Sequence, residues 1–241
     1  MQAKVLTVAS AKGGTGKSTV SVFAGQALAQ QGKRVLLIEL TEQLRNVDCI
    51  AGIEEQVVFD TSDWLAGRCT AERAMVKSPW YDNFFIMPAP YVYSPLELRA
   101  LKERLQPLLQ QFDFILFDTP TGIQPCFCEA CRISEQQVLL VLTDDVLALR
   151  SGRAVTEWIC ANSKANVRLV LNQAFRTGDK IDLDECIDTV AAQLLAVIPY
   201  SKHVLRSFAQ EHPLSEKTEV WKAFENLAAR LCGQEVPLLF S

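Results

Sequence analysis

A glycine-rich loop near the start of the chain carries the residue types that bind a phosphate. It reads Ser-Ala-Lys-Gly-Gly-Thr-Gly-Lys-Ser-Thr over residues 10–19, between an apolar run at 4–9 and an apolar-periodic stretch that begins at Val20. Glycines let backbone N–H groups turn inward around a phosphate, and the N-terminus of a following helix adds partial positive charge. This order of strand, loop and helix is what a phosphate-binding loop requires.

Two side chains of this loop are expected to contact a nucleotide directly. Lys17 would reach the β- and γ-phosphates, and the hydroxyl of Ser18 would ligate Mg²⁺. Five further loop residues would surround the phosphates, namely Gly13, Gly14, Thr15, Gly16 and Thr19. The predicted ligands are therefore ATP and Mg²⁺.

A carboxylate that could hold the metal is predicted at the end of a different buried strand. Asp118 ends the apolar run 114–118 and is followed by Thr-Pro-Thr-Gly. An aspartate after a strand is, in isolation, more often a cap or a turn former. A phosphate loop, however, needs a carboxylate beside it to hold the metal. We therefore interpret Asp118 as a metal-binding residue, together with Ser18.

Short β-branched runs alternate with longer helical patterns, which is typical of βαβ units. The predicted strands cover 4–9, 35–40, 83–88, 114–118, 137–143, 167–172 and 196–199. The predicted helices cover 18–31, 61–66, 71–77, 94–111, 146–161, 183–194 and 217–231. Ser-Pro-Leu-Glu at 94–97 reads as a capping box with proline at the first helical position, opening the fourth of these helices. We expect an α/β fold, a doubly wound and mainly parallel sheet with helices on both faces. With no linker or repeat in its 241 residues, one domain spans 1–241.

Charge and hydropathy narrow the possible partners. A formal net charge of -4 gives no general attraction for DNA, although Lys202, His203 and Arg206 would form a small basic patch. No apolar run approaches the roughly 20 residues that span a bilayer, and the N-terminus lacks the layout of a signal peptide. We therefore expect a cytoplasmic protein that does not bind DNA.

The phosphate loop resembles that of the MinD/ParA family of P-loop ATPases. Ala11 breaks the G-x-x-x-x-G-K-[ST] pattern, and Lys-Gly-Gly-x-Gly-Lys-Ser at 12–18 is the deviant Walker A loop of that family. Asp-Thr-Pro-Thr-Gly at 118–122 resembles its switch II segment, and Leu-Arg-Asn-Val-Asp at 44–48 resembles the MinD branch. The similarity extends over nearly the whole chain.

The resemblance implies an ATP-dependent homodimer. Two ATP-bound subunits would face each other, with Lys12 crossing to the partner's phosphates. A cation near the β–γ bridge stabilises charge on the leaving group, so hydrolysis would be coupled to dimerisation. Slow hydrolysis would then act as a switch for positioning or recruiting a partner protein. Asn172 and Pro199 match the family's adenine-binding positions.

The chain departs from the family at switch I, which begins with Asp-x-Asp. Glu39 and Thr41 stand at these two places, and with Lys12 and Lys17 they are the candidate catalytic residues. In the family the second Asp orients the attacking water, but a hydroxyl lacks the charge that polarises it. Two alternatives follow. Hydrolysis is slow, with an ATP-dependent scaffold as the limiting case, or Glu42 substitutes from the neighbouring position.

Three clustered cysteines form a second departure. Cys126, Cys128 and Cys131 follow switch II, where the related nitrogenase iron protein carries a cluster-binding cysteine. Paired across a symmetric dimer, such thiols would bind zinc or an iron–sulfur cluster, which gives a metal-handling ATPase as an alternative function. The other interpretation is that these cysteines are small buried residues at the start of a helix.

The C-terminal residues form a third departure. MinD-type chains end in a basic amphipathic helix that lies on anionic membrane, whereas residues 237–241 here read Pro-Leu-Leu-Phe-Ser without basic neighbours. We expect Leu238, Leu239 and Phe240 to pack against the domain. A peripheral position at the inner face of the membrane stays open as an alternative.

Overall fold

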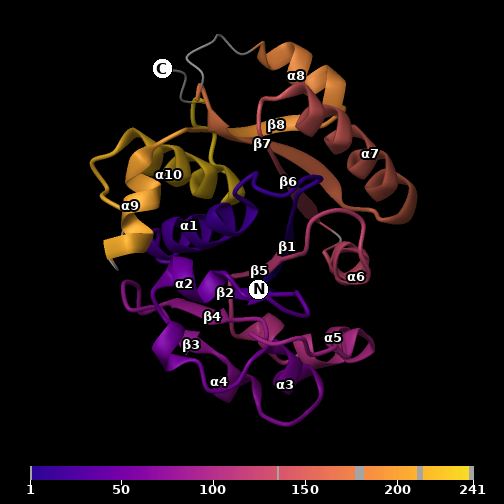
Figure 1. Ribbon diagram of the computed structural model, residues 1–241, viewed down its shortest axis with the longest axis vertical. Coiled ribbons are helices and arrows are strands. Elements are labelled where there is room, and N and C mark those ends of the chain that lie inside the picture. The colour runs from indigo at the N-terminus through magenta and orange to yellow at the C-terminus, as the bar shows by residue number, and fades with distance from the viewer. Residues whose placement is uncertain (1, 135, 177–181, 211–213, 239–241) are drawn as a thin grey trace.

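A sheet crosses the middle of the molecule in the computed structural model, which describes residues 2–134, 136–176, 182–210 and 214–238. Within these ranges eight strands pair in the order β3-β4-β2-β5-β1-β6-β7-β8 (Figure 1). They are β1 (Lys4–Ala9), β2 (Val35–Glu39), β3 (Val76–Lys77), β4 (Phe84–Met87), β5 (Phe114–Asp118), β6 (Gln137–Leu142), β7 (Asn166–Ala174) and β8 (Gln193–Pro199). The described pairings are parallel except that β3 runs antiparallel to β4.

Helices cover both faces of the sheet, which confirms the predicted doubly wound α/β fold. One face packs against α1 (Lys17–Gln30), α2 (Val47–Ala51), α9 (Lys202–Gln210) and α10 (Glu219–Leu231). The other packs against α3 (Thr61–Leu65), α5 (Leu98–Leu105), α6 (Pro125–Ile133), α7 (Val146–Asn162) and α8 (Leu183–Val190). Shorter pieces are α4 (Ala71–Ala74) and two 3₁₀ turns, η1 (Glu54–Gln56) and η2 (Leu108–Gln110). None of these described helices is long and apolar enough to cross a membrane.

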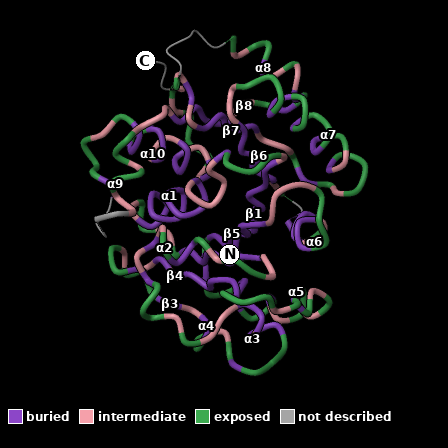
Figure 2. The backbone as a smooth tube through the Cα atoms, viewed as in Figure 1, coloured by how far each residue is buried: buried purple, intermediate pink, exposed green. Residues whose placement is uncertain are grey.

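The central strands read as continuous apolar runs because they are buried on both faces. Figure 2 shows β1, β5 and β6 buried along almost their whole length, whereas the outer sides of α7 and α8 are exposed. Helix α1 is also buried over most of its length, since α10 covers the side that faces away from the sheet. The rings of Phe23 and Phe224 meet there with centroids 5.3 Å apart.

The predicted capping box at 94–97 is wrong. Helix α5 begins at Leu98, and the Glu97 side chain makes no cap hydrogen bond. The backbone N–H groups of Ser94 and Leu96 instead donate to the carbonyl and the carboxylate of Glu42. A contact distant in sequence therefore overrides a local helix-start signal.

Three predicted helices are too long. The one at 94–111 ends with α5 at Leu105 and is followed by the 3₁₀ turn η2. The one at 71–77 ends with α4 at Ala74, because the next residues pair with β4 as strand β3. The one at 183–194 ends at Val190, where Ala191 takes a left-handed conformation with φ 54° and turns the chain into β8. The prediction also missed α2 and α9.

Parallel pairing brings the carboxyl ends of the strands to one edge. In the register of the sheet Asp118 of β5 lies opposite Val8 of β1 on one side and Glu39 of β2 on the other. The loop after β1 therefore starts beside two carboxylates, at the edge where ligands bind in open α/β sheets.

Close packing between α1 and β4 gives a test of the fold. A Cβ at Gly25 would lie 2.6 Å from two ring atoms of the buried Phe84. We expect Gly25→Val to lower the free energy of unfolding by about 1–3 kcal/mol through overpacking. Urea denaturation measures this. The double variant with Phe84→Leu removes the clashing ring atoms and should lose less than the sum of the two single changes, whereas strict additivity would contradict this packing.

Candidate active site

The phosphate loop turns at two glycines and is held by hydrogen bonds from two side chains of β7. Gly14 and Gly16 both have φ 81°, a left-handed conformation that favours glycine. Asn172 donates from Nδ2 to the carbonyl of Thr15 over 2.7 Å, and Gln173 donates from Nε2 to the carbonyl of Gly14 over 2.9 Å. The Asn172 amide lies so close to Gly16 that a Cβ there would be 2.3 Å from it. Glycine is thus required at position 16 by both conformation and space.

Asp118 binds the first turn of α1 through three side chains. Its Oδ1 lies 3.0 Å from Nζ of Lys17 and accepts a 2.7 Å hydrogen bond from Ser21, while Oδ2 accepts one of 2.7 Å from Ser18. The carboxylate is only 2 % exposed. Sequence reasoning missed Ser21, although the helical period places residue 21 one turn after Lys17 on the same side of α1.

Glu39 is a buried carboxylate whose two oxygens both accept backbone hydrogen bonds. Oε1 accepts from Asn46 at 3.0 Å and from Val47 at 3.4 Å, and Oε2 accepts from Ala89 at 3.0 Å. Burial, and then the charge of Asp118, raise the pKa of Glu39 from 4.5 to about 7. These contacts make Glu39 a support of the surrounding loops.

The next residues of the switch I segment alternate in direction. Thr41 and Gln43 line the same cavity as the phosphate loop, and the Thr41 hydroxyl donates to the carbonyl of Gln43 over 3.2 Å. The Glu42 carboxylate instead accepts from the backbone of Leu96 at 3.3 Å, outside that cavity. This arrangement argues against Glu42 as a substitute for the second switch I aspartate.

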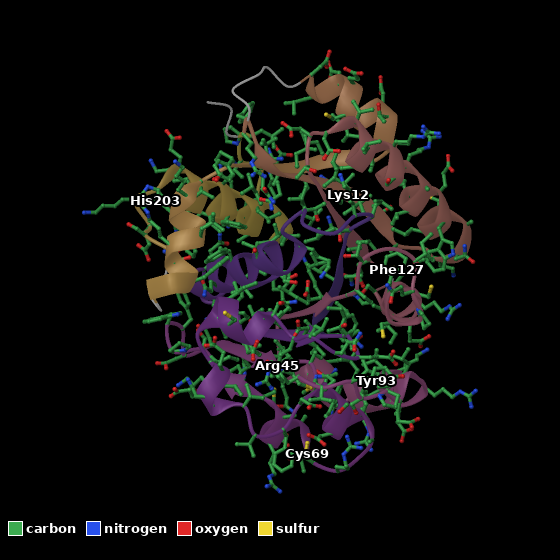
Figure 3. All side chains as sticks on the ribbon, viewed as in Figure 1. Lys12, Arg45, Cys69, Tyr93, Phe127 and His203 are labelled. Atoms are coloured by element: carbon green, nitrogen blue, oxygen red, sulfur yellow. The ribbon has the colours of Figure 1, made fainter. Side chains whose placement is uncertain are left out.

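The cavity at the carboxyl edge has a volume of about 580 Å³. Most of the sequence-predicted site residues meet on its walls, namely Gly14, Thr15, Gly16, Lys17, Ser18, Thr19, Glu39, Thr41 and Asp118. Gly13 and Lys12 do not line it. Lys12, labelled in Figure 3 on the loop that links β1 to α1, is half-exposed, and its Nζ lies 3.6 Å from Oδ1 of Asp145.

A second cavity of about 220 Å³ adjoins the first, since Gly16 and Thr19 line both. Asn172 and Pro199, the predicted adenine-binding residues, lie on its walls. Apolar side chains from β8, α9 and α10 complete it, namely Ile198, Val204, Leu205, Phe208, Val220 and Phe224. The α9 contribution was not foreseen from the sequence.

The three clustered cysteines do not form a metal site within one chain. Cys126 packs in the core beneath α5, whereas Cys131 packs in the core beneath α7. Burial raises the pKa of Cys126 to about 11 and that of Cys131 to about 12, which opposes the thiolate form that metals need. Among the described residues no group of three or more His, Cys, Asp or Glu side chains is arranged to hold a metal ion. Figure 3 places His203 on α9, across the molecule from Phe127 of α6.

The fold and the site together define a class. A phosphate loop on a central parallel strand, a lysine and a serine opening the next helix, and a carboxylate on the adjacent strand are the parts of a P-loop nucleoside triphosphatase.

Comparisons with known proteins specify this class further. The AAA domain family model matches residues 3–171. The septum site-determining protein MinD of Synechocystis is 32% identical over 247 residues, covering 98% of this chain and 92% of the relative. MinD of Bacillus subtilis is 30% identical, with 98% and 91% covered.

Solved structures agree with the sequence comparisons. The MinC:MinD cell division protein complex of Aquifex aeolicus matches with a TM-score of 0.90 at 29% identity, covering 99% of both chains. MinD of Pyrococcus horikoshii complexed with Mg-ADP matches with a TM-score of 0.85 at 25% identity, covering 95% and 96%. The chain belongs to the MinD/ParA family of P-loop ATPases. Within that family, the relatives named above that it resembles in sequence and structure are MinD proteins.

The tight contact at Gly16 yields a prediction about nucleotide binding. Gly16→Ala should abolish it, because the new Cβ would collide with Asn172 and the loop would lose its left-handed residue. Isothermal titration with ATP measures the affinity. Gly13→Ala is the structural control, since a Cβ there meets nothing within 4 Å, and it should keep the wild-type melting temperature. Wild-type affinity in Gly16→Ala would contradict this geometry.

Glu39 predicts a pH dependence of stability. Its pKa is about 7 in the folded chain against an ordinary 4.5, so the folded state holds the proton more tightly between these values. The contribution of Glu39 to stability therefore falls as pH rises through this window, by on the order of 3 kcal/mol in all. Urea denaturation across the window should give a flatter dependence for Glu39→Gln than for wild type. Parallel curves would refute the assignment.

Proposed function

We propose that this chain binds Mg²⁺·ATP in its two adjoining cavities, dimerises around it and hydrolyses it slowly as a switch for a partner protein. The observation that carries the proposal is the arrangement of Lys17, Ser18 and Asp118 at the phosphate loop. We infer that residues 1–241 form one domain and that this domain binds the nucleotide and dimerises.

The side chains at the proposed metal site fit magnesium. The Ser18 hydroxyl and the Asp118 carboxylate lie 2.7 Å apart, and such oxygen donors are the ligands that this hard cation prefers. Bound Mg²⁺ would neutralise charge on the phosphate oxygens. MinD of Pyrococcus horikoshii, solved with Mg-ADP, supports this assignment by similarity.

The second cavity suits the base and the first suits the phosphates. Asn172 and Pro199 flank a space beside Gly16 whose walls on the side of α9 and α10 are apolar. Such walls favour a planar ring, while the Asn172 amide supplies a polar contact. The assignment of adenine to this cavity rests on this shape and on the resemblance to the family.

Exposed apolar side chains support a second copy of the chain as the partner at this edge. Leu44 lines the phosphate cavity, Ile123 follows switch II, and Val146 and Leu147 open α7 beside Asp145, the ion-pair partner of Lys12. These four side chains are 46–76% exposed. Exposed apolar surface around a ligand site favours association.

Slow hydrolysis is supported by the way the acidic groups are used. Glu39 and Asp118 are the carboxylates on the walls of the phosphate cavity, and both are held by hydrogen bonds. A general base needs an acceptor that can take up a proton from water. The same observation supports an ATP-dependent scaffold with negligible turnover as the second candidate.

The partner and the location follow from relatives and charge. MinD of Aquifex aeolicus was solved in a complex with MinC, and the curated relatives are septum site-determining proteins. We therefore propose a protein partner in a cell-division setting in the cytoplasm, and the acidic net charge disfavours DNA. Leu239 and Phe240, two of the three residues considered for membrane contact, lie outside the described residues.

ATP turnover measured against protein concentration tests this proposal. Turnover per subunit should rise with concentration, in step with dimer formation followed by light scattering. Lys17→Ala should lose ATP binding, because its ammonium reaches the phosphates, and Lys12→Ala should bind ATP but lose the concentration dependence. Lys164→Ala, at an exposed position away from the site, should behave as wild type. Concentration-independent turnover would rule out the dimeric switch, and ATP-driven dimers without phosphate release would favour the scaffold.

A further inference from the structure

The loop that follows β2 is fastened at its ends by one glutamate. Glu39 begins it, and its carboxylate accepts hydrogen bonds from Asn46 and Val47 at the far end of the loop. The same carboxylate accepts from Ala89, just after β4. Three backbone donors at 3.0–3.4 Å therefore close residues 39–47 into a ring and join it to the neighbouring segment.

A second glutamate fastens the middle of this loop. The Glu42 carbonyl accepts from Ser94 at 2.8 Å, and its carboxylate accepts from Leu96 at 3.3 Å. The guanidinium of Arg45 lies 5.5 Å from the centre of the Tyr91 ring, which adds a cation–π contact between the same two segments. The loop is thus anchored by residues that do not line the phosphate cavity.

The two neighbours of the anchored Glu42, Thr41 and Gln43, lie on the wall of the phosphate cavity. The Thr41 hydroxyl donates a hydrogen bond to the backbone carbonyl of Gln43. Gln43 is an exposed residue on the cavity wall, and among the described residues no hydrogen bond engages its side-chain amide, which has two N–H donors and a carbonyl acceptor.

We propose that Gln43 holds the attacking water in this chain, with Glu39 and Glu42 as positioning residues that present it. The inference rests on the proposed binding of ATP phosphates in this cavity. An amide carbonyl accepts a hydrogen bond from water and directs an oxygen lone pair at the γ-phosphorus, the task that a glutamine performs in other P-loop enzymes.

The reaction balances without a protein base. The water oxygen forms a bond to the γ-phosphorus, and the bond from that phosphorus to the β–γ bridging oxygen breaks, with its electron pair leaving on ADP. One water proton passes to an oxygen of the transferred phosphoryl group, so the products are ADP and dihydrogen phosphate. Gln43 neither gains nor loses a proton, in keeping with slow hydrolysis.

Single-turnover cleavage and binding of a fluorescent ATP analogue, measured on the same variants, test this role. Gln43→Ala should slow cleavage by about 10–100-fold with unchanged affinity, because only the water is lost. Gln43→Glu keeps an acceptor oxygen and should restore cleavage. Glu42→Ala should slow cleavage and also speed hydrogen exchange of the amides at 41–46 and 90–96. The exposed Glu55 gives a matched control, since Glu55→Ala removes an equal charge without touching the loop.

The outcomes separate this inference from the proposed function. Wild-type cleavage in Gln43→Ala, or a Glu42→Ala variant with unchanged exchange and unchanged cleavage, would overturn the inference. Wild-type protein that binds ATP and never cleaves it would also overturn it while leaving nucleotide binding intact. Wild-type protein that binds no ATP would overturn the proposed function itself.

Discussion

One buried carboxylate ties the nucleotide edge of this protein together. Asp118 lies at the end of the central strand β5, and its side chain is almost completely buried. Its carboxylate lies within 3.0 Å of the side chains of Lys17, Ser18 and Ser21 of α1. Burying such a charge costs several kcal/mol unless its lone pairs are satisfied, and here three donors from one helical turn satisfy them. These contacts therefore fix the first turn of α1 against β5, and they also fix the end of the phosphate loop that leads into α1.

The neighbouring carboxylate serves a different purpose although the sheet sets it directly beside Asp118. The family resemblance leads one to expect an aspartate at position 39, and glutamate is one methylene longer. Both carboxylate oxygens of Glu39 accept hydrogen bonds from backbone N–H groups of two loops. A side chain so engaged stabilises the loop and is poorly placed to activate water. With glutamate in place of aspartate at position 39, the carboxylate serves to hold the loops and not to activate water.

Local signals and long-range contacts account for what the sequence could and could not reveal. The central strands and the phosphate loop were predictable because burial on both faces and glycine geometry leave marks within a few residues. The groups that support the site left no such mark. Glu42 accepts hydrogen bonds from Ser94 and Leu96, which lie 52 and 54 residues further along the chain, and α9 lines the second cavity from beyond β8. The cysteines were ambiguous for the same reason, since their spacing does not reveal that Cys126 and Cys131 face different cores.

The charges at the site also constrain how a nucleotide enters. Lys17 is the cation that balances Asp118, and Glu39 lies next to both, its pKa raised by burial and by the charge of Asp118. A triphosphate that draws Lys17 toward itself leaves Asp118 uncompensated beside a second carboxyl group, in a region where charges interact strongly. A divalent cation held by Ser18 and Asp118 would restore the balance that the lysine gives up. The electrostatics therefore favour entry of the nucleotide together with a metal ion over entry of the bare triphosphate.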